Sequence, residues 1–598
     1  MTVAAPERLV RAASLAELRA AGRLVVHMDR HALCLFAEGD EVCAVDNRCP
    51  HMGFPLHRGS VADGILTCHW HHARFDLCTG GTFDQWADEL RRFPVEVHGD
   101  DVFVDLMTPE DPVAHQRERL RIGLERNIAL VLAKATIALV EADRSGVEAF
   151  RAGLDFGVVR RGGGWFRGLT TLTCFMNLVS RLEPNERVAA LYHGLAEVAA
   201  DSADRPPHFP LEPLPGRTAD PARLALWFRR FIEVRDAEGA ERVLVSAVRT
   251  GASPSELADM LFAAATDHRY LDGGHTLDFV NKALEALDLA GWDRAEGVLA
   301  SLPAQLAAAE RMEEANEWRN PVDLVSLLKD AFAGLPDALA AGASRRGGWA
   351  GRDALVETVL GDDPGASIEA LVAALGEGAT EAELASAVSF AAANRIARFP
   401  VSNEFGDWDT ALHTFTFANA VEQGLRRSAS LELVRGVLDA AMSVHLDRFL
   451  NVPAARLPQP DPKADPDALL EGLPRMLDRQ QQVNEAGQLV ASFLGAGGDP
   501  TRLVAALGAA LTRENRNFHT IQCLEAAIRQ HELLAGTNAA GLPLIAAARY
   551  LAAHATTTRS ERQTFEIARR LHRGENLYED GPEATQKDHE RGEEPRVA

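Results

Sequence analysis

The spacing of hydrophobic and polar residues changes once along the chain, near residue 107. Before this point, short apolar runs alternate with Gly, Asp and Asn, a pattern typical of β-strands joined by tight turns. The predicted strands are RLVVHM, ALCLFA, EVCAVD, GILTC and DVFVDL. After this point, apolar residues recur every three or four positions in segments rich in Ala and Leu, which is the helical pattern.

We therefore expect a small all-β domain over residues 1–107, followed by a large all-α helical repeat region over 108–573. This second region is a candidate catalytic domain. Residues 574–598 are polar and charged, and this composition predicts a disordered tail.

The helical region contains an internal repeat. Each copy combines a helix, a Gly stop, a capping residue and a new helix. Ser253 and Thr380 each precede a Glu by three positions, which is the spacing of a capping box, and Asp499 precedes Pro500 at another helix start. The three copies are residues 244–268, 371–395 and 489–514. A repeat of this size predicts multi-helix units that stack on their neighbours.

A His-Thr pair follows each copy of the repeat. The histidines are His275, His413 and His519, and we expect each of them to open an equivalent helix. His193, in ALYHGLAEVA, is a candidate for the same place in an earlier unit. A buried histidine must find a hydrogen-bond partner or a ligand, so a repeated histidine has either a structural or a metal-binding role.

Length and charge narrow the classes of partner and location. The chain has 598 residues, which is too long for one hydrophobic core, and its net charge is -24. An acidic surface disfavours nucleic acid and anionic membranes as partners. The N-terminus lacks the pattern of a signal peptide, and no run of 18 apolar residues occurs. The seven cysteines are odd in number and scattered, so we expect a cytoplasmic protein with reduced thiols.

The residues that carry candidate chemistry lie in one stretch, 49–72, which holds two cysteines and five histidines. Cys49-x-His51 is followed by Cys68-x-x-His71, so each half offers one thiolate and one imidazole. Two sulfurs for one iron and two nitrogens for the other are the ligand set of a mixed Cys/His [2Fe-2S] centre. The same four residues also suit tetrahedral zinc. The Cys-x-His half is unlike a zinc-finger knuckle, however, and therefore favours the cluster.

With these two loops, residues 1–107 resemble a Rieske domain of the ferredoxin and oxygenase type. The resemblance implies a [2Fe-2S] cluster held by Cys49, His51, Cys68 and His71, and a reductase or ferredoxin as the electron donor. Respiratory Rieske proteins carry one further cysteine in each loop, and these two form a disulfide. Phe54 and Trp70 occupy the corresponding positions here.

The sequence contains no standard iron-binding motif for an electron acceptor. Rieske oxygenases and di-iron bundles hold iron through Asp-x-x-His with a second His five residues on, or through Glu-x-x-His, and both patterns are absent. His193, His275, His413 and His519 remain. In this respect the helical region resembles helical oxygenases of the questin-oxidase type, which bind iron through scattered histidines. That resemblance implies a mononuclear non-haem iron and a small organic substrate.

Two functions are therefore compatible with the sequence. In the first, the protein is an oxidoreductase whose cluster passes electrons to a metal site in the helical region. In the second, it is a non-enzymatic Rieske electron carrier or redox sensor on a helical interaction scaffold, and each repeated histidine caps or packs within its own unit. Metal analysis separates the two, because only the first requires a third metal ion per chain.

Overall fold

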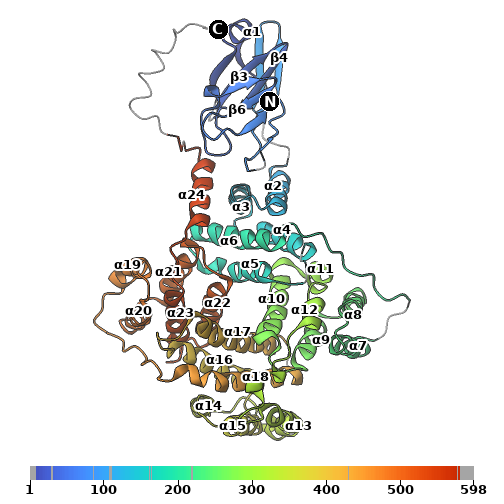
Figure 1. Ribbon diagram of the computed structural model, residues 1–598, viewed down its shortest axis with the longest axis vertical. Coiled ribbons are helices and arrows are strands. Elements are labelled where there is room, and N and C mark those ends of the chain that lie inside the picture. Colours follow the sequence, from blue (N-terminus) through green and yellow to red (C-terminus); the bar gives the residue numbers. More distant parts are fainter. Residues whose placement is uncertain are drawn as a thin grey trace, which may run out of the picture. The chain divides into compact units, whose positions relative to one another are not determined.

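The described part of the computed structural model falls into two compact units (Figure 1). The first contains Met1–Arg144 and Gln563–Ala598, and the second contains Ser145–Arg562. The described residues are 9–28, 31–84, 86–106, 111–160, 162, 164–216, 220–428, 430–575 and 577–578. The predicted fold class, a small β domain followed by a large helical region, is confirmed. The first unit extends past residue 107, however, because it includes two helices that follow the strands.

The strands of the first unit form three small antiparallel sheets, ordered β1-β10-β9, β2-β3-β4-β8 and β5-β6-β7. The strands are β1 (Leu9–Ser14), β2 (Arg23–Met28), β3 (His31–Glu38), β4 (Glu41–Asp46), β5 (Ser60–Ala62), β6 (Ile65–Thr67), β7 (Arg74–Asp76), β8 (Arg92–Phe93), β9 (Val95–His98) and β10 (Asp101–Asp105). The runs RLVVHM and EVCAVD coincide with β2 and β4. In the β3–β4 hairpin, Leu33 pairs with Asp46 and Glu38 with Glu41.

Two hydrophobic cores stabilise these sheets. One lies under β1, β2, β3 and β10, and the other surrounds the two cysteine loops, with Leu56, Leu66 and Phe75 fully buried. Cys43 and Cys78 form a disulfide in this second core, where we expected reduced thiols. Their Cα atoms are 5.2 Å apart, within the range that a disulfide spans, although their sequence separation is 35 residues.

Helices complete the first unit. They are α1 (Leu15–Ala21), η1 (Leu56–Arg58), α2 (Pro112–Arg126) and α3 (Ala129–Asp143), and α24 (Ser560–His572) contains the boundary between the units. Asp111 caps α2 by accepting a hydrogen bond from the Ala114 N–H, and Pro112 follows it at the first helical position. This is a favourable start, because proline at that position loses no helical hydrogen bond.

The second unit is entirely helical among its described residues. Its α-helices are α4 (Val147–Val159), α5 (Arg167–Leu178), α6 (Pro184–Ser202), α7 (Pro221–Glu233), α8 (Ala237–Arg249), α9 (Pro254–Thr266), α10 (His275–Ala290), α11 (Ala295–Leu299), α12 (Pro303–Ala308), α13 (Leu324–Gly342), α14 (Arg352–Val359), α15 (Pro364–Glu377), α16 (Glu381–Ala397), α17 (Phe405–Arg427), α18 (Leu431–Leu446), α19 (Pro466–Leu477), α20 (Val483–Gly495), α21 (Pro500–Arg513), α22 (Phe518–Leu533) and α23 (Gly541–Ala553). Its 3-10 helices are η2 (Val179–Arg181), η3 (Leu271–Gly274), η4 (Trp292–Arg294), η5 (Met312–Glu314), η6 (Asn316–Trp318), η7 (Ala343–Arg345) and η8 (Asp447–Asn451).

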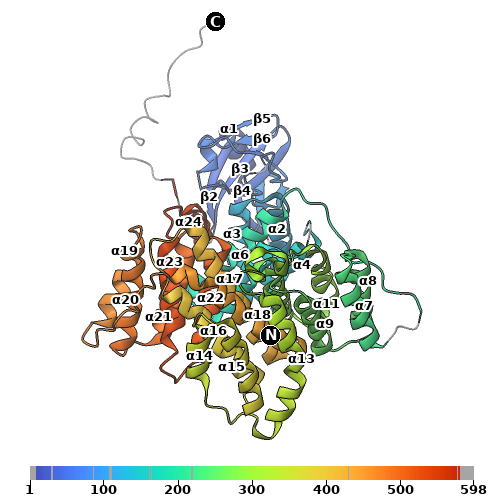
Figure 2. The same ribbon diagram turned by 60° about the horizontal axis from the view of Figure 1, so that its bottom comes forward.

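Four helices form a closed ring at the centre of this unit. Helix α5 packs on α10, α10 on α17, α17 on α22, and α22 on α5 again (Figure 1). Outer helices pack in pairs, such as α7 with α8 and α13 with α15 (Figure 2). None of the helices in the described part of the chain is both long and apolar enough to span a membrane.

The predicted helix starts are correct for the repeat but wrong for one histidine. Ser253 and Thr380 cap α9 and α16 in complete capping boxes, and Asp499 caps α21. His275 is the first residue of α10, and His519 is the second of α22. His413 does not open a helix. It lies about two turns inside α17, because Glu404 forms a capping box and starts that helix at Phe405.

Candidate functional site

The two cysteine loops of the first unit have the same backbone hydrogen bonds. The Cys49 N–H donates to the carbonyl of Phe54, and the Cys49 carbonyl accepts from Gly53. In the second loop, the Cys68 N–H donates to the carbonyl of Ala73, and the Cys68 carbonyl accepts from His72. The loops are therefore equivalent turns, one after β4 and the other between β6 and β7.

The tight turn of each loop requires a left-handed residue at the same position. Gly53 has φ 82 in the first loop, and His72 has φ 62 in the second. Glycine adopts this conformation without cost, whereas a residue with a Cβ adopts it with some strain. His72 therefore forms the turn that a glycine would form, and the geometry of the second loop is kept.

Four side chains of these loops converge. The thiols of Cys49 and Cys68 are buried and face one another. The facing Cys49 thiol, helped by backbone N–H groups of the loop, lowers the pKa of Cys68 to about 6. The rings of His51 and His71 lie 4.9 Å apart, centroid to centroid, and His71 is exposed.

These residues fit a [2Fe-2S] cluster. His51 is half-buried, and burial, together with the positive charges nearby, lowers its pKa to about 4, so its ring is neutral at pH 7. Its Nδ1 is buried and has no hydrogen-bond partner. An unpartnered buried nitrogen is costly unless it binds a ligand. The facing thiols of Cys49 and Cys68 and the neighbouring ring of His71 complete a donor set of two sulfurs and two nitrogens.

Aromatic residues connect the two loops at Phe54 and Trp70, the positions where respiratory Rieske proteins have the cysteines of a disulfide. The rings of Phe54 and Trp70 lie 6.4 Å apart, and the ring of Tyr578 packs against both, at 4.9 and 5.4 Å. Residues 576 and 579–598 of the predicted tail lie outside the described residues. The described part of that tail includes Tyr578, which packs against the core around the loops.

In the second unit, three of the four repeat-associated histidines lie together. One ligand nitrogen each from His275, His413 and His519 lies within 4.8 Å of the others. The Nε2 atoms of His413 and His519 are 3.1 Å apart, and the ring of His275 lies 4.4 Å from that of His413. We call these three residues the histidine triad. They come from α10, α17 and α22, three members of the central ring of helices.

His193 is not part of this group. It is buried in α6, and its Nδ1 is 2.8 Å from a carboxylate oxygen of Glu561. Phe175 and Tyr192 are its aromatic neighbours.

A tight turn positions His275 at the start of its helix. Tyr270, Asp272, Gly273 and Gly274 all have positive φ. At Gly274 a side chain is excluded, because a Cβ there would lie 2.8 Å from the Cβ of Phe417. Left-handed residues in succession are a strained arrangement that often marks a functional site.

Electrostatics keep two members of the triad, His275 and His413, uncharged. Burial, followed by the neighbouring histidines, lowers the pKa of His275 to about 4 and that of His413 to about 3. Both are therefore neutral at pH 7 and can offer a nitrogen lone pair.

Asp409 lies one turn before His413 on α17. One of its oxygens is 3.6 Å from Nδ1 of His519, and the other accepts a hydrogen bond from the Tyr550 hydroxyl and lies 3.5 Å from Nε2 of His554. A carboxylate at the far nitrogen of a histidine is the arrangement that orients metal-binding imidazoles. We did not identify Asp409 from the sequence. The signal that could have found it is its position four residues before His413, which is one helical turn.

A buried polar network continues from the triad along the same helix faces. On α10, Asp278 and Lys282 follow His275 at helical spacing, and on α22, Gln522 and Glu525 follow His519. Gln522 donates a hydrogen bond to Asp278, whose pKa burial raises to about 7.

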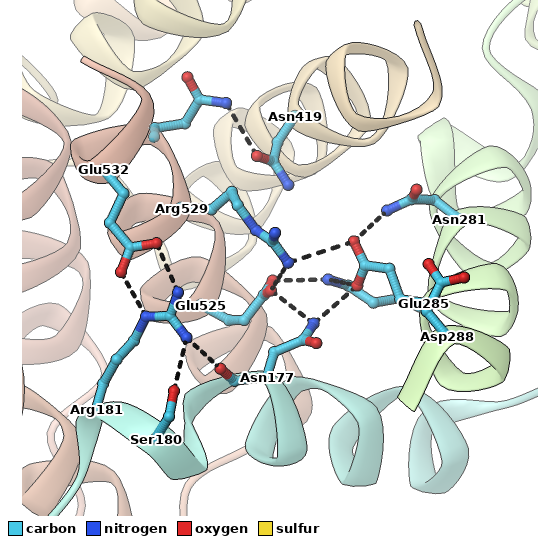
Figure 3. A network of polar contacts seen from close by, with 12 residues as sticks. Asn177, Ser180, Arg181, Asn281, Glu285, Asp288, Asn419, Glu525, Arg529 and Glu532 are labelled. Carbon is cyan, nitrogen blue, oxygen red and sulfur yellow. Dashed lines mark hydrogen bonds and ion pairs between the residues drawn. The ribbon is translucent and has the colours of Figure 1, made fainter. Parts of the chain in front are cut away.

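The centre of this network is an ion-paired lysine. The Lys282 ammonium donates to Glu285 at 2.9 Å and to Glu525 at 2.7 Å. Asn177 of α5 also donates to both carboxylates, at 2.8 and 2.9 Å, and Arg529 lies 3.7 Å from each of them (Figure 3). The network therefore satisfies both buried carboxylates and ties three helices of the ring together.

A cavity of about 310 Å³ shares helix α17 with the triad. Thr410 and Thr414 of α17 line it on either side of His413 in the sequence, and Tyr270 lines it from the turn before His275. Its wall is mostly apolar and includes Trp318. Asp447 adds a carboxyl group with one buried, unpartnered oxygen, and burial raises its pKa to about 7. This composition suits an organic molecule with one polar group.

Comparison with known proteins identifies the first unit. The family model of the Rieske [2Fe-2S] domain matches residues 8–94. The ferredoxin component of a naphthalene 1,2-dioxygenase system from Pseudomonas aeruginosa is 29% identical over 101 residues, 17% of this chain and 97% of that protein. The ferredoxin subunit of a 3-phenylpropionate/cinnamic acid dioxygenase from Shigella boydii is 37% identical over 76 residues, 12% of this chain and 72% of that protein.

Other similarities are equally short. Human apoptosis-inducing factor 3 is 35% identical over 71 residues, and this match spans only 12% of either chain. Among solved structures, the ferredoxin of carbazole 1,9a-dioxygenase from Nocardioides aromaticivorans is 27% identical, covering 16% of this chain and 97% of that one, with a TM-score of 0.16. These matches span between 12% and 17% of this chain.

Proposed function

Because the chain belongs to the Rieske [2Fe-2S] family through residues 8–94, we propose that it is an oxidoreductase whose Rieske domain passes electrons to a metal centre in the helical unit. The observation that carries the proposal is the histidine triad, formed by three imidazoles from helices far apart in the sequence. The electron donor is a reductase or a ferredoxin, in keeping with relatives that are ferredoxin components of dioxygenase systems.

In this proposal, Cys49 and Cys68 hold one iron of the cluster, and His51 and His71 hold the other. The bound cluster supplies one-electron transfer. The equivalent backbone turns of the two loops set the four side chains, and the buried thiols keep water from the sulfur side. His71 is exposed and therefore offers a way for the electron to enter or leave.

In the helical unit, His275, His413 and His519 hold a mononuclear non-haem iron. The Nε2 atoms of His413 and His519, 3.1 Å apart, are close enough for both to bind one ion. Three imidazoles leave coordination positions open for oxygen or substrate. Asp409 orients the ring of His519. A small organic substrate occupies the cavity beside α17, where Asp447 contacts its polar group.

A different account also fits the distance between His413 and His519. Two neutral imidazoles can share one N–H···N hydrogen bond, and the triad would then be a buried polar contact within the core. In that case only the cluster binds metal, and the protein is an electron carrier or redox sensor on a helical scaffold. The number of metal ions per chain decides between the two accounts.

The test is metal analysis of the full-length chain after anaerobic reconstitution with ferrous iron and sulfide. We expect about three irons per chain in the wild type and about two in His413→Ala and His519→Ala. His531→Ala is the matched control, because His531 lies on α22 with His519 but bonds the carbonyl of Ala540. It should keep three irons. A folded wild-type chain with two irons and no other metal would leave the carrier or sensor function.

A further inference from the structure

Lys134 of α3 reaches the first cluster loop from outside the segment matched to the Rieske family. Its ammonium donates a hydrogen bond to the carbonyl of Pro50, the residue between Cys49 and His51. The side chain is only 13% exposed, and the whole arrangement lies within the first unit. Residues 8–94 hold the two loops, whereas α2 and α3 follow them as an additional helical hairpin. This hairpin therefore places a cation against the loop.

One carboxylate only partly balances this cation. Asp88 accepts a hydrogen bond from Arg119 of α2, and its carboxylate lies 3.4 Å from Nζ of Lys134. Its side chain is 8% exposed, and the two cations hold its pKa below the usual range against the effect of burial. Two positive charges and one negative charge thus leave a net charge of +1 in this buried group. Burial, together with the charge of Arg119, lowers the pKa of Lys134, and both Asp88 and Cys49 oppose that effect.

A buried charge next to an iron-sulfur cluster changes its reduction potential. Reduction adds one electron, so a fixed positive charge nearby stabilises the reduced form and raises the potential. The effect is largest where water is excluded, because the effective dielectric constant is low there. A hydrogen bond to the carbonyl of the loop also draws electron density away from the ligand residues.

We propose that Lys134 is a tuning residue that raises the reduction potential of the cluster, and that Asp88 moderates it. This inference rests on the cluster part of the proposed function and is independent of the histidine triad. It assigns a redox role to the α2–α3 hairpin. If the same contacts only fixed the hairpin to the loop, removing the positive charge and removing the negative charge would not shift the reduction potential in opposite directions.

The experiment is a reductive titration of the full-length protein, followed by visible absorption and by EPR of the reduced cluster. Lys134→Gln keeps an N–H donor for the Pro50 carbonyl but removes the charge, so its potential should fall. Asp88→Asn removes the negative charge, so its potential should rise. Lys134→Arg should stay near the wild type. The EPR g-values should be unchanged in all three variants, which shows that the ligands are intact.

Shifts of the same sign in Lys134→Gln and Asp88→Asn would overturn the proposal, because a common disturbance of the loop would then explain both. An unchanged potential in Lys134→Gln would overturn it as well. If Asp88→Asn does not fold, Arg119→Met is measured instead; it removes a positive charge and should lower the potential, and a rise of the potential in this variant would overturn the proposal. If the wild type shows no EPR signal of a reduced cluster, the cluster assignment itself is wrong. An unchanged potential in Lys134→Gln refutes only the tuning role of Lys134.

Discussion

Histidine residues in this chain differ in charge because their neighbours differ. His268 lies between two carboxylates, with Nδ1 2.5 Å from Glu313 and Nε2 2.6 Å from Glu233. These contacts raise the pKa of His268, and the contact with Glu313 has the largest effect. For His275 and His413, burial is the largest influence, and it lowers the pKa. His268 is therefore an ion-pair partner, whereas His275 and His413 are suited to bind a metal.

His268→Gln should destabilise the helical unit in a pH-dependent way. The pKa of His268 is raised in the folded state, so its contribution is complete below the unfolded pKa of about 6.5 and disappears as pH rises through the folded pKa. We expect a loss of about 1–2 kcal/mol near pH 6 and a smaller loss near pH 9, measured by denaturant unfolding. His98→Gln is the control, because its ion pair with Glu96 is exposed. An equal loss at both pH values would contradict the assignment.

At the scale of elements, α10 and α22 each carry a polar stripe into the centre of the ring. His275, Asp278, Lys282 and Glu285 follow one another at intervals of three or four residues, so they share one face of α10. A buried stripe of this kind is stable only while every charge has a partner. Lys282 supplies the partner for two carboxylates at once. Lys282 is the closest cation to both carboxylates, with Asn177 and Arg529 as further partners, so the packing of these helices depends strongly on its ammonium group.

Lys282→Met should destabilise the helical unit by about 3–5 kcal/mol, because it removes the cation that is closest to the buried carboxylates of Glu285 and Glu525. Guanidinium unfolding monitored by circular dichroism measures this. The triple variant Lys282→Met, Glu285→Gln, Glu525→Gln removes all three charges and should recover part of the loss. A single variant within about 1 kcal/mol of the wild type would show that Arg529 alone compensates the carboxylates.

At the scale of the whole molecule, the chain divides into two compact units, each with buried hydrophobic residues. The core around the cysteine loops contains the thiols of Cys49 and Cys68 themselves. Metal bound there contributes to the folding of that unit, because the site does not exist in the unfolded chain. Removal of the cluster should therefore affect one unit more than the other.

Cys68→Ser should abolish the EPR signal of the reduced cluster, because a serine hydroxyl is a poor ligand for this iron. In calorimetry we expect two transitions, with the one from the first unit lowered by about 5 °C or more and the other unchanged. Cys34→Ser is the matched control, because Cys34 is buried in the same unit but lies outside both loops. It should keep the EPR signal. A normal signal in Cys68→Ser would show that the ligand assignment is wrong.

The sequence by itself determined the features that depend on short stretches of chain. Strands, capped helices and the two cysteine loops each form within about twenty residues. Over such a length the hydrophobic period, the capping side chains and the turn residues act locally. For this reason Ser253 and Thr380 cap the helices they were expected to cap, and the family of the first unit follows from Cys49 to His71.

Only the tertiary structure decided which distant side chains meet. His275, His413 and His519 come together because α10, α17 and α22 close a ring with α5, whereas His193 faces Glu561 instead. The Lys282 ion pairs and the contact of Lys134 with the first loop also join helices or loops far apart in the chain. Such contacts depend on how helices pack, and packing depends on the shapes of all their faces together, which no local pattern contains.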